Sequence, residues 1–535
     1  MSPRSRWTVL GLTLAYLGLA ATAVVGDRFL HDEGLLTHLL ASLVDRAPAA
    51  TLLLQKSRPP LALLYAPVAG LGVGAFLWAH VLVSALAVPL VAATAARLGH
   101  ARPELAAAVV ALSPMHVAAG AAGLMNADAV VGLAVVALLW ARQRWLAAGA
   151  VMGTLVWVRA ELAVVALVLA LWALWRRHPR MLLGLAAFPI LYGAAGAVYH
   201  GELLWMLRFP PALVEPMAGN PYWESHHAEA SLPTVAAGLL AITPALPLLA
   251  TWRLRGAPEV ERVGLLAVGL LATALLVLPR WQVFNFDLSP RYLLPVLPFA
   301  ALAVSRAFAG LGPDDAAVSG LGRGLGLGLL AAIAIAIERL GGGGWALVAV
   351  GGSAGVAALA GAGWPRLAWL AVGGLVVLGP LAYVDGARLA RRLSSPALDQ
   401  AVTRLREHPE WKDRPIYTNE PLLDAYLERS GALPGRDVRY LVQADQLHEL
   451  TTLANPDNGQ REALLAALRI GFYGTPVLPD ELTPQAVPPG AVLVLRQDQR
   501  LSMVMPPERW APWLTMVHPG VELEIAVRND AEAIP

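Results

Sequence analysis

Several residue types that carry common chemistry are missing or rare in this 535-residue sequence. There is no cysteine, which excludes disulfide bonds, thiolate metal sites and cysteine nucleophiles. Charged residues make up 15% of the chain, whereas a soluble protein carries about 25%. Lys56 and Lys412 are the two lysines among 40 basic residues. The net charge is +2 and no basic patch with interleaved aromatics occurs, so nucleic acid is not an expected partner.

Apolar residues, in contrast, are abundant and are grouped in long runs. They form 57% of the chain, and the mean hydropathy is +0.57. Because about 18 consecutive apolar residues suffice to cross a bilayer as a helix, the runs predict an integral membrane protein. We expect about 13 transmembrane helices, over residues 7–25, 75–97, 104–123, 129–141, 145–158, 162–175, 181–199, 232–252, 263–279, 292–308, 324–337, 345–362 and 367–384.

Arginine clusters orient these spans, because basic residues stay on the cytoplasmic side. The N-terminal Arg4 and Arg6 place the N-terminus inside, and the odd span count then places the C-terminal segment outside. Arg388, Arg391 and Arg392 follow the last span and run against this trend. The prediction is that the C-terminal domain lies outside, on the same face as Asp32 and Glu33.

The composition changes near Pro396, and a soluble domain is expected from there to the end of the chain. We therefore predict a transmembrane domain over residues 1–386 and a soluble α/β domain over residues 396–535, in which short strands alternate with helices. A proline-rich stretch over residues 476–489 is expected to be surface loop. The expected strands are Ile416–Thr418, Val438–Val442, Ala491–Leu495 and Glu522–Val527, and the expected helices are Leu422–Arg429, Gln460–Leu468 and Pro507–Leu514.

Two adjacent carboxylates, Asp32 and Glu33, follow the first span closely. A carboxylate at the edge of the bilayer can lie in a partly dry cavity, where its pKa is tunable and it can act as a general base. The alternative is a solvated loop acid. A second acid, Asp128, opens the fourth span, where a negative charge favours a helix N-terminus even without a further role.

Cations accompany these acids. Lys56 and Arg58 precede Pro59-Pro60 and could bind a lipid phosphate, or could simply anchor the chain at the interface. Arg291 precedes Tyr292 at the start of the tenth span. Its side chain could bind phosphate, or it could simply snorkel to the membrane surface. Arg159 lies with Glu161 in an apolar stretch, where ionisable residues are costly and therefore either pair, for instance with Asp128, or serve function.

Metal and nucleotide signals are weak. His226 and His227, with Glu224 and Glu229 nearby, could form a metal site, but their spacing matches no standard motif. A divalent metal is therefore possible, and no cofactor is certain. The glycine-rich residues 320–328 neither follow a strand nor open a soluble helix, so the dinucleotide-binding reading is rejected.

Four segments resemble, in the same order, the GT-C superfamily of membrane glycosyltransferases. The resemblance is closest to bacterial relatives of protein O-mannosyltransferases and of lipid A aminoarabinose transferases, in glycosyltransferase family 39. Each segment alone is a weak signal, and their order carries the match over about 300 residues. The segments are HDEGLL at 31–36, KSRPPLALLYAP at 56–67, GLMNADAVVGLAVVAL at 123–138 and SPRYLLPVLPFAAL at 289–302.

The resemblance implies a transferase that uses a polyprenyl-phosphate sugar on the outer face. Asp32 takes the place of the catalytic acid, by resemblance, and the expected reaction is a single displacement that inverts the anomeric centre. The acceptor can be a glycan, a lipid or a protein. The candidates around the cavity are Glu33, Asp128, Lys56, Arg58, Arg159 and Arg291.

Two other functions compete with this reading. A transporter or lipid flippase would show inverted repeats and charges along a through-path, whereas no repeat is evident and the charges gather at the outer face. A non-catalytic membrane scaffold would display the C-terminal domain and would not need Asp32.

Overall fold

The computed structural model divides the chain into two compact units. The first comprises residues 1–24, 78–197 and 210–389, and the second comprises residues 25–77, 198–209 and 390–535. The structure describes residues 1–25, 32–45, 48–53, 57–205, 242, 256–277, 290–309, 396–420, 423, 427, 437–441, 475–477, 481–496, 505–518 and 523–529.

The first unit is helical in its described part. Prolines open several of its helices, since proline lacks the N–H that would be unpaired at that position and has a helical φ. The boundaries between the units fall within α5 and α12. The elements are α1 (Pro3–Val25), α5 (Val73–Ala85), α6 (Ala87–Arg97), α7 (Pro103–Ala111), α8 (Pro114–Ala121), α9 (Met125–Ala141), α10 (Trp145–Leu155), η1 (Ala160–Leu162), α11 (Ala163–Trp175), α12 (Pro179–His200), α16 (Glu259–Val277), η4 (Pro290–Val296) and α17 (Leu297–Ala309).

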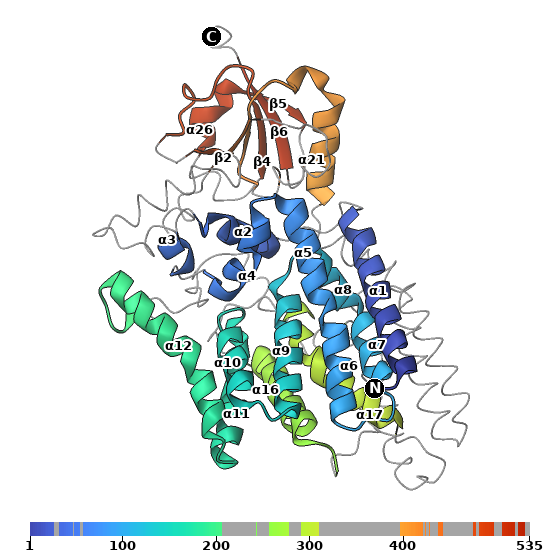
Figure 1. Ribbon diagram of the computed structural model, residues 1–535. Helices are drawn as coiled ribbons and strands as arrows, with labels where there is room; N and C mark the ends of the chain where they lie inside the picture. Colours follow the sequence, from blue (N-terminus) through green and yellow to red (C-terminus); the bar gives the residue numbers. More distant parts are fainter. Residues whose placement is uncertain are drawn as a thin grey trace. The chain divides into compact units, whose positions relative to one another are not determined.

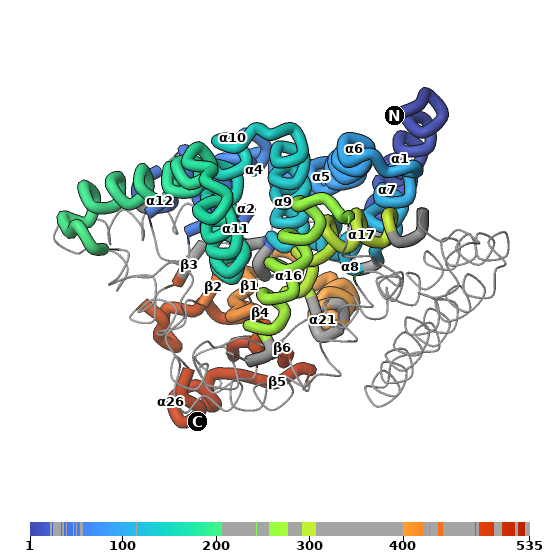
Figure 2. Tube along the Cα trace, turned by 90° about the horizontal axis from the view of Figure 1, so that it is seen from below, coloured from blue at the N-terminus to red at the C-terminus, as the bar shows by residue number. Residues whose placement is uncertain are grey.

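Helix α9 lies in the middle of this unit. Figure 2 shows it between α10 and α11 on one side and α6 and α17 on the other, and α9 packs against α6, α10, α17 and η4. Twelve of its 17 residues are buried, including the polar Asn126 and Asp128 of its first turn. A helix that is apolar on all sides belongs in the interior of a bundle, and its N-terminal polar residues then need partners inside the protein.

Helices α10 and α12 approach closely through glycine. Gly149 and Gly153 of α10 are four residues apart, and a Cβ at Gly149 would collide with the carbonyl oxygen of Met181. A Cβ at Gly184 of α12 would likewise collide with the carbonyl oxygen of Leu146. Small residues with this spacing let two membrane helices bring their backbones into contact.

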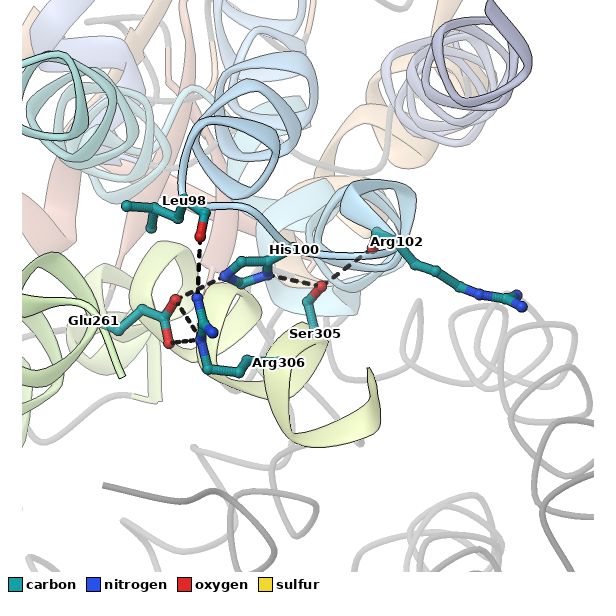
Figure 3. A network of polar contacts seen from close by, with 6 residues as sticks. All are labelled: Leu98, His100, Arg102, Glu261, Ser305 and Arg306. Atoms are coloured by element: carbon teal, nitrogen blue, oxygen red, sulfur yellow. Dashed lines mark hydrogen bonds and ion pairs between the residues drawn. The ribbon is translucent and has the colours of Figure 1, made fainter. Parts of the chain in front are cut away.

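A buried polar network joins the α6–α7 turn to α16 and α17 (Figure 3). Glu261 is fully buried; it accepts two hydrogen bonds from Nε of Arg306, at 2.8 and 2.9 Å, and one from Nε2 of His100, at 2.7 Å. Ser305 lies 3.2 Å from Nδ1 of His100 and donates to the carbonyl of Arg102. A buried carboxylate requires such partners, so this network fixes the three segments to one another.

Two helices in the described part of the chain are long and apolar enough to cross a membrane. They are Val73–Arg97, of 25 residues, formed by α5 and α6, and Pro179–His200, of 22 residues. The pair α7 and α8 qualifies as a third span if it is counted as one bent helix. The second and seventh predicted spans are thus supported, while the total of 13 stays a prediction. Apart from residue 242, the spans expected over 232–252, 324–337, 345–362 and 367–384 lie outside the described residues.

The third predicted span is not one straight helix. It bends by 58° between α7 and α8, at Ser113-Pro114. A residue before proline is pushed out of the helical region, and Ser113 is accordingly extended, with ψ of 111°. Its hydroxyl then caps α8 by accepting from the backbone N–H of His116, at 3.3 Å.

The second unit contains a small helical part and an α/β part. Helices α2 and α4 pack together through Leu40, Val44 and Ala62. Helix α4 begins at the Pro59-Pro60 step, where proline is tolerated in the first turn. The elements are α2 (Asp32–Leu43), α3 (Pro48–Leu52), α4 (Pro59–Ala69), α21 (Pro396–Glu407), η5 (Pro409–Trp411), β1 (Ile416–Thr418), β2 (Val438–Leu441), β3 (Thr475–Val477), β4 (Val492–Arg496), α26 (Pro507–Trp510), η7 (Ala511–Trp513), β5 (Leu514–His518) and β6 (Leu523–Arg528).

The α/β part is built on one six-stranded sheet with the order β3-β2-β1-β4-β6-β5. The first four strands in this order are parallel, and β6 and β5 are antiparallel additions. In Figure 1 the sheet lies between α21 and α26. The central strand β4 is buried at four successive residues, Val492 to Leu495, because it is covered on both faces.

The sheet confirms four predicted strands and corrects two other expectations. Pro476 lies in β3, although it was expected in a surface loop; β3 is an edge strand, where a missing N–H is tolerated. The helix expected over Pro507–Leu514 ends at Trp510, and Leu514 already begins β5. The prolines in this segment allow only short helical turns. The helix expected over Gln460–Leu468 lies outside the described residues.

Candidate functional site

The first turn of α9 places Asp128 next to a histidine from another helix. Oδ2 of Asp128 lies 3.0 Å from Nε2 of His80 in α5, and both side chains are buried. Nδ1 of His80 donates to the carbonyl of Gly120, at 2.7 Å. A carbonyl can only accept, so this bond fixes a hydrogen on Nδ1 and directs Nε2 at the carboxylate.

A second histidine lies beside this pair. Nε2 of His116 donates to the carbonyl of Ser84, at 3.2 Å, and its ring lies 5.1 Å from that of Tyr16. The hydroxyl of Tyr16 donates to the carbonyl of His116, at 3.2 Å. Helices α1, α5 and α8 are therefore joined by polar contacts next to the His80–Asp128 pair.

Two arginines flank Tyr292 of η4, an element that packs against α9. Cζ of Arg159 lies 4.7 Å from the ring centre of Tyr292, and Cζ of Arg291 lies 5.3 Å from it. Both distances are within the range of cation–π contacts. Nε of Arg159 also donates to Glu161, at 2.7 Å, and this ion pair is buried. Arg159 thus pairs with its own neighbour in η1.

Asn126 connects these arginines to the acid. Its side-chain amide donates to the carbonyl of Arg291, at 3.0 Å, from the same helical turn that carries Asp128. A continuous series of contacts therefore links α5, α9, η4 and η1. We call this set the α9 cluster; its members are His80, Asn126, Asp128, Arg159, Glu161, Arg291 and Tyr292.

The other predicted site residues lie in the second unit. Asp32 and Glu33 are the first two residues of α2. Arg58 precedes the Pro-Pro step of α4, and its guanidinium donates to the carbonyl of Ser57, at 3.1 Å. Lys56, His226 and His227 lie outside the described residues. Among the described residues, no group of three or more His, Asp or Glu is arranged to hold a metal ion.

Hydrogen bonds fix the direction of α2 relative to α4. Ser57 donates to the carbonyl of Thr51, and Thr51 donates to the carbonyl of Leu43 at the end of α2. At the far end of α4, the carbonyl of Ala69 accepts from Nε2 of His38, at 3.0 Å. The helices are therefore antiparallel. Asp32 begins α2 eleven residues before Leu43, so its backbone lies about 16 Å along the helix from the end next to Arg58.

Sequence reasoning missed His80 and His116. A signal for His80 was present, since it interrupts an apolar run, where an ionisable residue needs a partner or a function. Arg159 and Arg291, both candidates for phosphate binding, share a contact with Tyr292. Asp128, expected to open the fourth span, lies in the first turn of α9 and is 6% exposed.

The α9 cluster can perform two kinds of chemistry. Guanidinium groups held in place by a ring and a carboxylate can bind the oxygens of a phosphate and stabilise charge on it. A carboxylate held by an imidazole can accept a hydrogen bond from a hydroxyl or exchange a proton with it. Ionisable groups in apolar surroundings are costly and either pair with one another or serve function.

Comparison with known proteins gives a structural match and no sequence match. No family model and no curated protein matches the chain. The structure of ArnT from Cupriavidus metallidurans bound to undecaprenyl phosphate matches with a TM-score of 0.54, at 17% identity, over 98% of this chain and 99% of that one. The apo structure of the same protein matches with a TM-score of 0.51, at 18% identity, over 99% of each chain. This chain therefore has the fold of these two ArnT structures.

Proposed function

We propose that this protein is a membrane glycosyltransferase that moves a sugar from a polyprenyl-phosphate donor to an acceptor on the extracytoplasmic side. The observation that carries the proposal is that the guanidinium groups of Arg159 and Arg291 both contact the ring of Tyr292. The fold supports it, because an ArnT structure with the same fold was solved with undecaprenyl phosphate bound. The acceptor class stays open between glycan, lipid and protein.

Transfer from a lipid phosphate needs cations at the leaving group. When the bond between the anomeric carbon and the phosphate oxygen breaks, negative charge grows on that phosphate. Arg159 and Arg291 are suited to stabilise it, because their contacts with Glu161 and Tyr292 hold them in place before the reaction. Lys56 and Arg58 stay candidates for binding a lipid phosphate.

Transfer also needs a base when the acceptor is a hydroxyl. We assign this role to Asp32, at the start of α2, and keep Glu33 and Asp128 as further acidic candidates. Asp32 takes the acceptor proton while the acceptor oxygen attacks the anomeric carbon and the polyprenyl phosphate leaves. One displacement inverts the anomeric centre, so no covalent sugar–enzyme intermediate is required.

The division into units supports the topology. Residues 25–77, which contain Asp32 and Arg58, form one compact unit with residues 390–535. Two segments in one compact unit that lie outside the spans are expected on the same side of the membrane. We therefore place the C-terminal domain and Asp32 together on the extracytoplasmic side of a bacterial-type inner membrane.

Binding of polyprenyl phosphate to the purified protein tests the proposal. Arg291→Gln is expected to weaken binding roughly 10- to 100-fold, because a hydrogen bond to a charged group contributes about 1.5–3 kcal/mol. Arg159 should be replaced together with Glu161, as Arg159→Gln/Glu161→Gln, so that no buried carboxylate is left unpaired.

The matched control is Arg176→Gln. Arg176 lies in the same unit and forms an ion pair with Glu259, at 3.0 Å, with 47% of its side chain exposed. Its replacement should leave binding unchanged. If the triple variant at 159, 161 and 291 bound polyprenyl phosphate as tightly as the parent, the α9 cluster would not be the donor-phosphate site.

A further inference from the structure

Two histidines that are 110 residues apart in the sequence meet in the C-terminal part of the second unit. His408 lies between α21 and η5, and His518 is the last residue of β5. Their Nε2 atoms are 3.0 Å apart, and both residues are half-buried. The contact joins the helical segment before the sheet to an edge strand of the sheet.

Two contacts fix the orientation of the His408 ring. Its Nδ1 donates to Oε1 of Glu410, at 2.7 Å. Its face stacks on Trp411, with the ring centres 3.9 Å apart and the planes 12° apart. A hydrogen on Nδ1 leaves the lone pair on Nε2, which therefore points toward His518. A carboxylate bound to the other ring nitrogen is also the usual partner of a histidine that ligates a metal.

The separation of the two Nε2 atoms suits a shared cation. Zinc binds imidazole nitrogen at about 2.0–2.1 Å, and tetrahedral geometry then places two such nitrogens about 3.3 Å apart. The observed 3.0 Å requires only a small displacement of the rings. Without a cation the contact is a single hydrogen bond in which Nε2 of His518 donates to Nε2 of His408.

We propose that His408 and His518 bind a divalent transition-metal ion of the Zn²⁺ type, with Glu410 orienting His408. Two neutral imidazoles favour Zn²⁺, Cu²⁺ and Ni²⁺, whereas Mg²⁺ and Ca²⁺ prefer oxygen ligands. The described residues contribute two protein ligands, so water completes the coordination and the ion exchanges with solution. The site is separate from the α9 cluster and does not depend on the proposed transferase activity.

A cation at this position would stabilise the edge of the sheet. Strand β5 is the last strand in the order β3-β2-β1-β4-β6-β5 and pairs with β6 on one side. A metal bridge from His518 to His408 ties it to the segment that follows α21. Zn²⁺ is therefore expected to raise the unfolding temperature of the full-length protein, since a ligand that binds the folded state stabilises it.

Calorimetric titration of the metal-free, full-length protein with Zn²⁺ tests the proposal. His408→Asn and His518→Asn should each abolish the binding and the rise in unfolding temperature. Glu410→Gln should weaken binding about 10- to 100-fold, as is typical when the partner of a ligating histidine is lost. His178→Asn is the control, because His178 is also half-buried and stacks on Trp145, with the ring centres 4.2 Å apart.

Two outcomes would overturn the proposal. One is that the parent protein binds no Zn²⁺ at micromolar concentrations. The other is that His408→Asn and His518→Asn bind it as the parent does while His226→Asn/His227→Asn does not, which would move the site elsewhere. Unfolding in the absence of metal shows whether each variant is folded, and the two histidine variants come from different segments, so loss of one by misfolding leaves the other informative.

Discussion

Nε2 of His80 lies 3.0 Å from Oδ2 of Asp128, and both groups are buried inside the helical unit. The carbonyl of Gly120 accepts a hydrogen bond from Nδ1 of His80, so Nε2 faces the carboxylate. A buried pair of this kind contributes little net stability but is costly to break. Experiments can therefore separate the contribution of the His80–Asp128 pair to stability from its contribution to function.

We predict that Asp128→Ala destabilises the protein by about 3–5 kcal/mol, because it leaves a buried imidazole without its partner. The double replacement His80→Leu/Asp128→Leu removes both groups and should recover most of that loss. Thermal unfolding measures the stability, and sugar transfer measures the function. If the double variant recovered full transfer activity as well, the pair would be purely structural and Asp128 would leave the proposed site.

Asp32→Asn is expected to reduce turnover by at least about 100-fold with a hydroxyl acceptor, the lower range for general-base catalysis. The amide keeps the shape of the carboxylate, so expression and unfolding temperature should change little. Asp45→Asn is the control, because Asp45 follows the same helix and is exposed. Equal turnover by the parent and by Asp32→Asn would remove Asp32 from the mechanism.

Helix α10 should not tolerate even a methyl group at its contact with α12. Gly149→Ala and Gly153→Ala place Cβ against backbone carbonyls, which cannot move as a side chain can, so each is expected to destabilise by about 1–3 kcal/mol. Gly269→Ala in α16 is the control, since no atom lies within 4 Å of the position that a Cβ would take there. It should be neutral or slightly stabilising, because alanine favours helix. Similar unfolding temperatures for all three variants would contradict the close packing of α10 and α12.

The burial of His38 is expected to make the free energy of unfolding depend on pH. Burial between α2 and α4 lowers the pKa of His38 from 6.5 to about 4, partly offset by its hydrogen bond to the carbonyl of Ala69. Between these values the unfolded chain binds the proton and the folded protein does not. The contribution of His38 is therefore complete above pH 6.5 and is lost as the pH falls toward 4, by roughly 3 kcal/mol in all.

The variant His38→Gln isolates this contribution. Glutamine can donate to the same carbonyl but does not titrate, so the stability of the variant should fall less between about pH 7 and pH 4.5 than that of the parent. Unfolding temperatures measured over this range in detergent provide the comparison. Parallel curves for the two proteins would show that His38 is not buried in the folded protein.

Periodicity and composition predicted much of the secondary structure, and tertiary contacts decided the rest. The strands at Ile416, Val438, Val492 and Leu523 follow from short β-branched runs, whereas β5 was missed because prolines and tryptophans precede it. The break at Pro114 carried a local signal in the proline itself. No local signal showed that Asp128 meets His80, since the two are 48 residues apart and the contact depends on how α5 packs against α9.

The site residues were predicted only in part, because local sequence signals mark single residues and do not show which residues meet in the fold. Ionisable residues in apolar surroundings marked Arg159 and Asp128, and the start of a late span marked Arg291. Their common centre, Tyr292, was not identified as a contact point, because it depends on the packing of η1 and η4 around the start of α9.

Mass spectrometry of lipids and glycoconjugates from cells with and without the gene tests the central claim most directly. Without the protein, a polyprenyl-phosphate sugar is expected to accumulate, and one glycan, lipid or protein acceptor is expected to lose the mass of that sugar. Cells carrying Asp32→Asn should resemble cells without the gene. If neither the polyprenyl-phosphate sugars nor any glycoconjugate changed, the protein would not be the proposed glycosyltransferase.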